Sequence, residues 1–170
     1  MNSEDAIQHL GLTAQERAFG RHVRSDRLIQ AGLDALLAGV ESPSLALLAG
    51  LTRSEEPEAQ ELFDRVLEEL GLVVEVPGDE RAAAWAKAYW LAGRIVDGSL
   101  DPAVGTDRIW VETAWDLNRP EELREVVECA QTLAAWDEDR AARGISFDVL
   151  KAEAAAAAER FLRTRPRRLP

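Results

Sequence analysis

Residues 81–117 contain the clearest pattern in the chain and constrain the fold more than any other stretch. Apolar positions recur every three or four residues over 84–96, which is the spacing of one apolar stripe along an α-helix. Gly98 offers the left-handed conformation that ends a helix, and Asp101-Pro102 has the residue types that begin the next one. Because only about four residues separate the two helices, we expect an antiparallel helical hairpin.

The remaining sequence repeats this amphipathic pattern, which favours an all-α fold. Thr13 and Glu16 match a capping box, so one helix is expected to start at Thr13 and, if unbroken, to reach residue 38. The β-branched run 72–76 is expected to be a connector, because a lone strand has nothing to pair with. Further helices are expected over 3–10, 54–70, from Pro120 to near Trp136, and 147–163, with a short apolar helix wedged between longer ones at 43–49. The sequence therefore predicts an antiparallel bundle of about six to seven helices.

Length and composition favour one domain. A chain of 170 residues, 46% of them hydrophobic, can bury a single core without disulfides. We expect an acidic helical domain over residues 1–159 and an Arg-rich, frayed tail over 160–170. Cys129 is the only cysteine and lies close to the inner stripe of its helix, so we expect an inert thiol.

Charge and hydropathy limit the partners. The net charge is -11, and five arginines in the tail leave residues 1–159 at -16. Such a body repels nucleic acid and anionic lipid and attracts a basic protein, although acidity can equally serve solubility alone. The start of the sequence lacks a signal-peptide pattern, and no apolar run reaches the ~20 residues of a membrane span. We therefore expect a cytoplasmic location without membrane or nucleic-acid binding.

The tryptophans of the hairpin are the strongest candidates for a binding surface. Each helix carries two of them five residues apart, a rotation of about 140°, so both indoles of a pair cannot face the core. An indole at the boundary can anchor a protein interface. Alternatively, all the indoles belong to the core and its edge. The predicted partner-binding residues are Trp85, Trp90, Trp110, Trp115, Glu112 and Asp116.

A histidine and an aspartate suggest a different site. If 13–38 is one helix, His22 and Asp26 share a face, and the carboxylate can orient the imidazole as a general base requires. With Tyr89 and boundary tryptophans they would line a small-molecule pocket inside the bundle. Alternatively, Ser25 or Asp26 caps a second helix and leaves His22 exposed. Because no further His or Cys has ligand spacing, we expect no metal site.

A basic stripe gives a third, weaker candidate. Arg17, Arg21 and Arg24 would line the opposite side of the same helix, where they could bind an anion or a carboxylate of a partner. The alternative is that they pair with acidic helices of the protein itself or are solvated.

Two classes of function follow from these patterns. The chain has no phosphate-binding glycine loop and no nucleophile with its base, so we expect no cofactor and no catalytic residue. The first class is a non-enzymatic binding protein, such as an adaptor, inhibitor or immunity-type protein, which presents the Trp-rich acidic surface to a basic partner. The second is a small-molecule-binding bundle or enzyme that uses His22, Asp26 and Tyr89.

Overall fold

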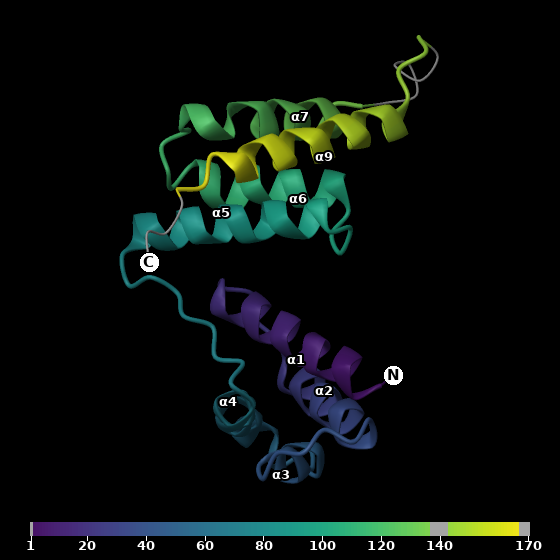
Figure 1. Ribbon diagram of the computed structural model, residues 1–170, viewed down its shortest axis with the longest axis vertical. Helices are drawn as coiled ribbons and strands as arrows, with labels where there is room; N and C mark the ends of the chain where they lie inside the picture. The colour runs from purple at the N-terminus through teal and green to yellow at the C-terminus, as the bar shows by residue number, and fades with distance from the viewer. Residues whose placement is uncertain (1, 137–142, 167–170) are drawn as a thin grey trace. The chain divides into compact units, whose positions relative to one another are not determined.

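The computed structural model describes residues 2–136 and 143–166 (Figure 1). All regular secondary structure in these ranges is helical, which confirms the predicted all-α class. The chain divides into two compact units, Met1–Val76 and Pro77–Pro170. The sequence predicts one core over 1–159, whereas the described buried side chains gather in two clusters, one in each unit. Gly71 and Pro77-Gly78 explain the division, because they end one helix and delay the next, and no helix links the two clusters.

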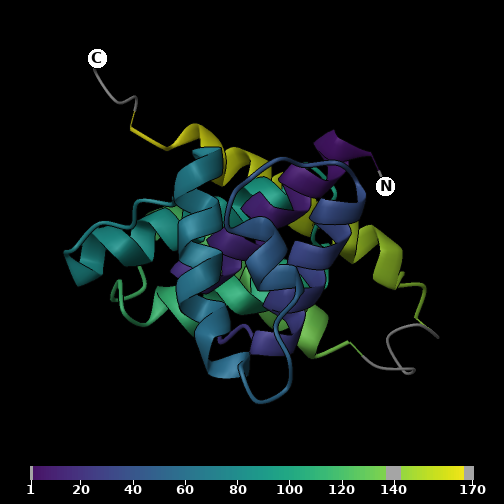
Figure 2. The ribbon, with the colours of Figure 1, turned by 90° about the horizontal axis from the view of Figure 1, so that it is seen from below.

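The first unit, Met1–Val76, consists of four α-helices and one short 3-10 helix among its described residues. They are α1 (Ser3–Ala18), α2 (Ser25–Leu37), α3 (Leu45–Ala49), η1 (Glu56–Glu58) and α4 (Ala59–Leu70). Helix α4 is seen end-on in Figure 1, where α1 and α2 lie across the view, and along its length in Figure 2, so it crosses them steeply. The predicted connector continues the core of this unit, because Leu72 and Val74 pack against it while Val73 is exposed.

Helix α1 begins at Ser3, as the predicted helix over 3–10 does, and continues through Thr13, where the capping box predicts a separate helix start. Asn2 and Asp5 form a capping box of their own, in which the Asn2 side chain accepts the Asp5 N–H at 2.8 Å. Thr13 lies inside the helix and donates its hydroxyl to the His9 carbonyl oxygen at 2.9 Å. A threonine in a helix interior can bond the preceding turn in this way, so the S/T-x-x-E pattern did not mark a helix start here.

The expected helix over 13–38 is broken after residue 18. Gly20 takes a φ of 88°, which ends the helical path, and α2 begins at Ser25. The alternative of a second helix at this point is therefore confirmed. Neither Ser25 nor Asp26 caps it, because the N-cap position is Arg24 and has no side-chain cap hydrogen bond.

The predicted wedged helix is present as α3, which packs against α2 and α4. Gly32 permits the contact with α2, because a Cβ at this position would lie 2.8 Å from the Leu48 side chain. The Glu69 carboxylate of α4 holds the chain at the start of α3. It accepts the Ser44 N–H at 2.9 Å, the Ser44 hydroxyl at 2.6 Å and the Ser42 hydroxyl. These hydrogen bonds, of which the one from Ser42 has the largest effect, hold the pKa of Glu69 below its ordinary value.

The Glu69 carboxylate makes the stability of the first unit sensitive to acid. Its pKa is lower in the folded protein than in the unfolded chain, so its contribution is complete above the unfolded pKa of about 4.3 and is lost as pH falls through the folded pKa. Glu69→Gln should therefore be less stable than the wild type at pH 7, and the difference should close on acidification. Urea unfolding of both proteins at pH 7 and pH 3 measures this difference in the free energy of unfolding. Glu68→Gln, on the neighbouring exposed position, is the control, and a difference independent of pH would contradict the prediction.

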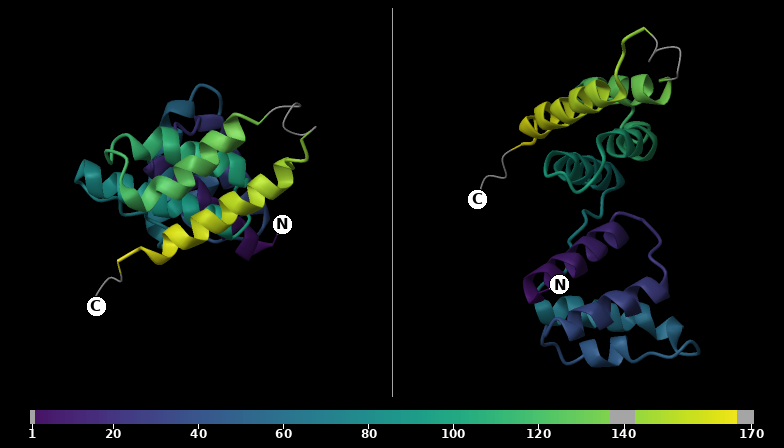
Figure 3. Two further views of the ribbon diagram at one scale, coloured as in Figure 1. Left: turned by 90° about the horizontal axis from the view of Figure 1, so that it is seen from above. Right: turned by 90° about the vertical axis from the view of Figure 1, so that its right-hand side faces the viewer.

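The second unit, Pro77–Pro170, is a bundle of four described α-helices. Its elements are α5 (Glu80–Val96), α6 (Pro102–Ile109), the π-helical turn η2 (Trp110–Ala114), the 3-10 turn η3 (Glu121–Leu123), α7 (Arg124–Ala134) and α9 (Phe147–Arg163). Helices α7 and α9 pack over the hairpin of α5 and α6 (Figure 3). Buried Ala154, Ala157 and Ala158 give α9 the small side chains that a close approach requires.

The predicted hairpin is confirmed in its details. Gly98 has a φ of 81° after α5, and the Asp101 carboxylate caps α6 by accepting the N–H groups of Ala103 at 2.9 Å and Val104 at 3.4 Å. Asp101 also pairs with Lys151 of α9 at 2.5 Å, which ties the start of α6 to a third helix. The hydrogen bond from Lys151 is the main cause that holds the pKa of Asp101 below its ordinary value.

The last helix has the bounds that the sequence predicts, 147–163, and therefore contains the first residues of the predicted tail over 160–170. Residues 160–163 belong to α9 instead of a frayed tail, and Phe161 is only 2% exposed. Its ring stacks on Tyr89 with centroids 4.7 Å apart and lies 6.3 Å from the Trp85 ring. Residues 167–170 of the predicted tail lie outside the described residues.

Candidate functional site

The α5–α6 hairpin continues into a π-helical turn that positions the candidate binding residues. In a π turn each backbone hydrogen bond reaches one residue further than in an α-helix. Thr113, which is fully buried, donates its hydroxyl to the Ile109 carbonyl oxygen at 2.6 Å and so satisfies an acceptor at the start of the turn. Ala114 faces the core, while Val111 and Trp115 face outward.

Trp115 is the most distinctive residue on this surface. All five tryptophans lie in the described ranges, and Trp115 alone is exposed, at 58% of its surface. Val111, one turn earlier, is 60% exposed. The Arg119 guanidinium lies 3.8 Å from the centroid of the Trp115 ring, which is a close cation–π contact. Asp116 is exposed beside them.

A strained backbone holds Arg119 in this place. Asn118 and Arg119 have φ values of 61° and 49°, so two successive residues other than glycine take the left-handed conformation. Asparagine tolerates this region, whereas an arginine there costs roughly 1–2 kcal/mol. The Arg119 N–H donates to the Ala114 carbonyl oxygen at 2.7 Å and closes the turn. Strained residues of this kind cluster at functional sites, because the surrounding structure must compensate for them.

The other tryptophans of the hairpin are half-buried and pack within the second unit. Trp85 stacks on Tyr89 with ring centroids 5.9 Å apart. Trp90 lies under Arg94 and Arg108, whose guanidinium carbons are 5.3 and 5.7 Å from its centroid. Trp110 packs against the core cluster. Trp85 and Trp90, the pair on α5, therefore lie at the boundary between core and solvent. In the second pair, Trp110 packs against the core and Trp115 faces the solvent.

Glu112, predicted to meet a partner, is instead part of a charged cluster at the junction of α5 and α6. Its carboxylate pairs with Arg108 Nε at 2.9 Å and with Lys87 Nζ at 2.8 Å. The Arg108 side chain is only 8% exposed. Burial acts to raise the pKa of Glu112, but the hydrogen bonds from Arg108 and Lys87 outweigh it, and the pKa lies below its ordinary value.

The histidine site is not assembled within the first unit. His22 lies in the loop before α2, where it is exposed, and Asp26 lies in the first turn of α2, also exposed. The Asp26 carboxylate accepts the Arg27 N–H at 3.0 Å and pairs with Arg24 at 3.2 Å. The shared helix face that the sequence suggested is absent because the helix breaks between the two residues. Tyr89, the third residue of that site, belongs to the second unit.

The basic stripe is also divided by the helix break. Arg17 is in α1, whereas Arg21 and Arg24 are in the loop that follows. Arg17 pairs with Asp64 of α4 at 2.6 Å, and its guanidinium lies 5.7 Å from the Phe63 ring centroid. Arg17 and Arg24 therefore pair with acidic residues of the protein itself, which is an alternative that the sequence left open.

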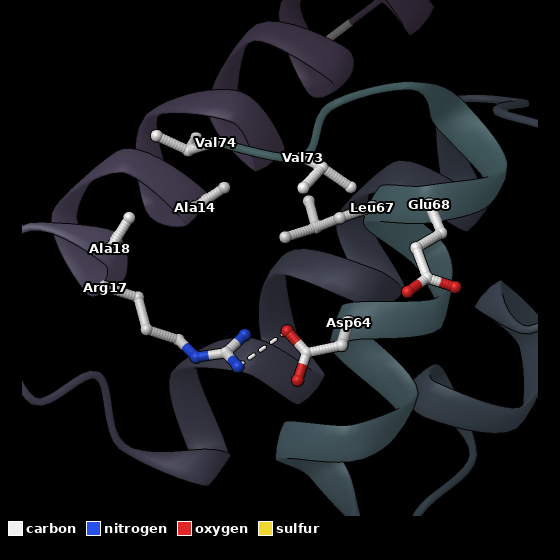
Figure 4. A pocket seen from close by; sticks show the side chains of 8 residues that line it. All are labelled: Ala14, Arg17, Ala18, Asp64, Leu67, Glu68, Val73 and Val74. Carbon is white, nitrogen blue, oxygen red and sulfur yellow. Dashed lines mark hydrogen bonds and ion pairs between the residues drawn. The ribbon is translucent and has the colours of Figure 1, made fainter. Parts of the chain in front are cut away.

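The Arg17–Asp64 pair closes one side of an open pocket of about 420 Å³ in the first unit (Figure 4). Ala14 and Ala18 of α1 face Leu67 of α4 across it, and the segment after α4 forms a third side. The charged groups at its rim are the paired Arg17 and Asp64, together with Glu68. The pocket offers apolar surface with carboxylates at its rim.

Cys129 lies in a second pocket, of about 450 Å³, between α7 and α9. Burial and the charge of Glu153 raise the pKa of its thiol, so the thiol stays protonated near neutral pH. This agrees with the inert cysteine that the sequence suggests. Among the described residues, no group of three or more His, Cys, Asp or Glu is arranged to hold a metal ion.

The cation–π contact between Arg119 and Trp115 was not predicted from the sequence. For this part of the chain the sequence predicts only that a helix starts at Pro120. Asparagine before a helix start is a signal for the left-handed region, but nothing in the sequence indicates that the arginine follows it. The π-helical turn likewise has no local signature.

Comparison with known proteins gives no relative: no family model, no curated protein and no solved structure matches the chain. None of the described helices combines the length and the apolar composition that a membrane span requires.

Proposed function

We propose that the protein is a non-enzymatic binding module, of the adaptor, inhibitor or immunity type, which presents the surface around Trp115 to a basic protein partner. The single observation that carries the proposal is the exposed Trp115 ring held by Arg119. Tryptophan and arginine are the residue types enriched where interfaces gain most of their binding energy. Holding a large apolar ring in water with a strained turn costs free energy, and such a cost is typical of a surface that binds a partner.

The surroundings of Trp115 support an interface. Val111 extends the apolar area by one turn, and Arg119 limits the motion of the indole, so less side-chain entropy is lost on binding. Exposed Asp116 and Glu122 lie close in sequence and add negative charge. Together with the net charge of -11, they favour association with a basic surface.

Substitution of Trp115 should weaken binding far more than it weakens the fold. We expect Trp115→Ala to lower the affinity for a purified partner more than tenfold, because truncation of a central anchor costs about 2 kcal/mol or more. The melting temperature should change little, because an exposed side chain loses only its cation–π contact, roughly 0.5–1 kcal/mol. Partners captured from the native cell and then purified provide the assay, with calorimetry for the affinity.

Leu47→Ala is the matched control. Leu47 of the first unit is 59% exposed, almost the same fraction as Trp115, so both substitutions remove exposed apolar area. If Trp115→Ala and Leu47→Ala bind the partner as well as the wild type does, or if the captured partner is acidic, the proposal is wrong.

A further inference from the structure

A shallow groove runs between α6 and α7 in the second unit. It has a volume of about 270 Å³ and is lined by Ala103, Val104, Asp107, Ala130, Leu133 and Ala134. Three of these six residues are alanines, so a partner can approach the backbones of both helices closely. The groove is therefore suited to a regular element laid along it.

Exposed apolar side chains extend this groove toward the Trp115 surface. Val104 of α6 is 49% exposed. Val111 of η2 follows it by seven residues, and Trp115, just after η2, follows it by eleven. In a regular α-helix these spacings would bring all three to one face, and the π-helical turn rotates Val111 and Trp115 away from that exact alignment. The groove and these three exposed side chains are here called the α6 strip.

Asp107 places a carboxylate in the α6 strip, between Val104 and Val111. It is exposed, and among the described residues its carboxylate has no ion pair or hydrogen bond. Covering it with an apolar partner would leave a carboxylate without water, which is costly. A partner that supplies a lysine or arginine at this point would instead gain a charge-assisted hydrogen bond.

We infer that the α6 strip binds an amphipathic α-helix of a protein partner, with apolar residues spaced i, i+4, i+7 and i+11 and one Lys or Arg that pairs with Asp107. This inference rests on the proposed function and names the partner's binding element. A helix fits because an apolar groove between two helices is the usual receptor for one. A second copy of the chain fits poorly, because it also carries a charge of -11 and meets Asp107 with like charge.

A selection from a library of peptides tests this directly. Phage that display random 18-residue peptides are selected on the full chain, and the enriched peptides are then measured against the wild type and Val104→Asp. We expect the enriched peptides to share the stated apolar spacing and a Lys or Arg. Their affinity should fall more than tenfold for Val104→Asp. Val104 is half-exposed, so this variant should keep the helical circular dichroism of the wild type.

The charge at Asp107 allows a reciprocal test. Asp107→Lys should weaken an enriched peptide severalfold, and changing the peptide's Lys or Arg to Glu should restore its affinity for this variant while lowering that for the wild type. Leu47→Asp in the first unit is the control and should bind as the wild type does. A charge swap without restoration would overturn the pairing with Asp107.

The outcomes separate this inference from the proposed function. Enriched peptides that are basic but extended, and that still depend on Trp115, would overturn the helical partner and leave the binding module in place. Peptides that bind Trp115→Ala and Val104→Asp equally well would overturn both. A dimer in sedimentation that dissociates on Val104→Asp would show that a second copy covers the strip and would also overturn the inference.

Discussion

A chain that ends at Glu159 is expected to lose the fold of the second unit, whereas a chain that ends at Pro166 is expected to keep it. The difference between them includes Phe161, which is 2% exposed and stacks on Tyr89 at 4.7 Å. Replacing a buried phenylalanine with alanine costs about 3–5 kcal/mol, a large share of the 5–15 kcal/mol that stabilises a typical domain. The shorter chain also loses the last turn of α9.

Urea unfolding followed by circular dichroism measures this prediction. Phe161→Ala in the full chain should lose about 3–5 kcal/mol of unfolding free energy, and Phe161→Leu should lose much less because it refills most of the space. Removal of residues 167–170 alone is the matched control. If chains ending at 159 and 166 unfold at the same urea concentration, residues 160–163 contribute nothing to the core and the assignment of α9 is wrong.

Removal of the Glu112 carboxylate should have an effect of similar size. Glu112→Ala leaves Arg108 and Lys87 without their shared partner, and Arg108 is only 8% exposed. Breaking a buried ion pair from one side costs about 3–5 kcal/mol, and we expect the lower end because Glu112 itself is 29% exposed. Stability measured by urea unfolding at pH 7 should fall by about 3 kcal/mol.

A triple variant shows whether the loss comes from unpaired charge. Lys87→Met, Arg108→Met and Glu112→Leu together remove every charge of the cluster, so this variant should be more stable than Glu112→Ala alone. Because the folded pKa of Glu112 is lowered, its contribution is present at neutral pH and is lost as pH falls through that pKa. A triple variant as unstable as Glu112→Ala would show that packing, not charge, causes the loss.

The helical hairpin could be predicted because each boundary depends on one or two residues. Gly98, Asp101 and Pro102 act through their own backbone and side-chain geometry, whatever the rest of the fold. The capping box at Thr13 failed because the same residue pattern can occur inside a helix, where the threonine bonds the preceding turn. A local sequence pattern predicts a helix boundary reliably only where its side chains have no competing hydrogen-bond partner nearby.

The division into two units could not be predicted from length and composition. These set how much surface a chain can bury, but not whether the buried side chains gather in one cluster or two. The available signal is Gly71 and Pro77-Gly78, which bound the connector predicted over 72–76. Amphipathic helices carry the same apolar stripe whether they pack around one core or around two, so the stripe does not distinguish these cases.

The candidate site was predicted in part. The rotation of about 140° between paired tryptophans places at least one of each pair near the surface, and Trp115 is there. The sequence could not show that Glu112 is held by Lys87 and Arg108, because Lys87 lies 25 residues away on another helix. His22 and Asp26 depended on an unbroken helix, and Gly20 breaks it.

The distribution of the tryptophans gives the second unit a spectroscopic signal of its own in solution. All five lie between residues 85 and 136, in the second unit, and the first unit has no tryptophan or tyrosine. Intrinsic fluorescence excited at the indole band thus reports the melting of residues 77–170 alone, whereas far-ultraviolet ellipticity reports both halves of the chain. Two midpoints that disagree between these optical probes would show that the halves melt as separate cooperative blocks, without any label or mutation.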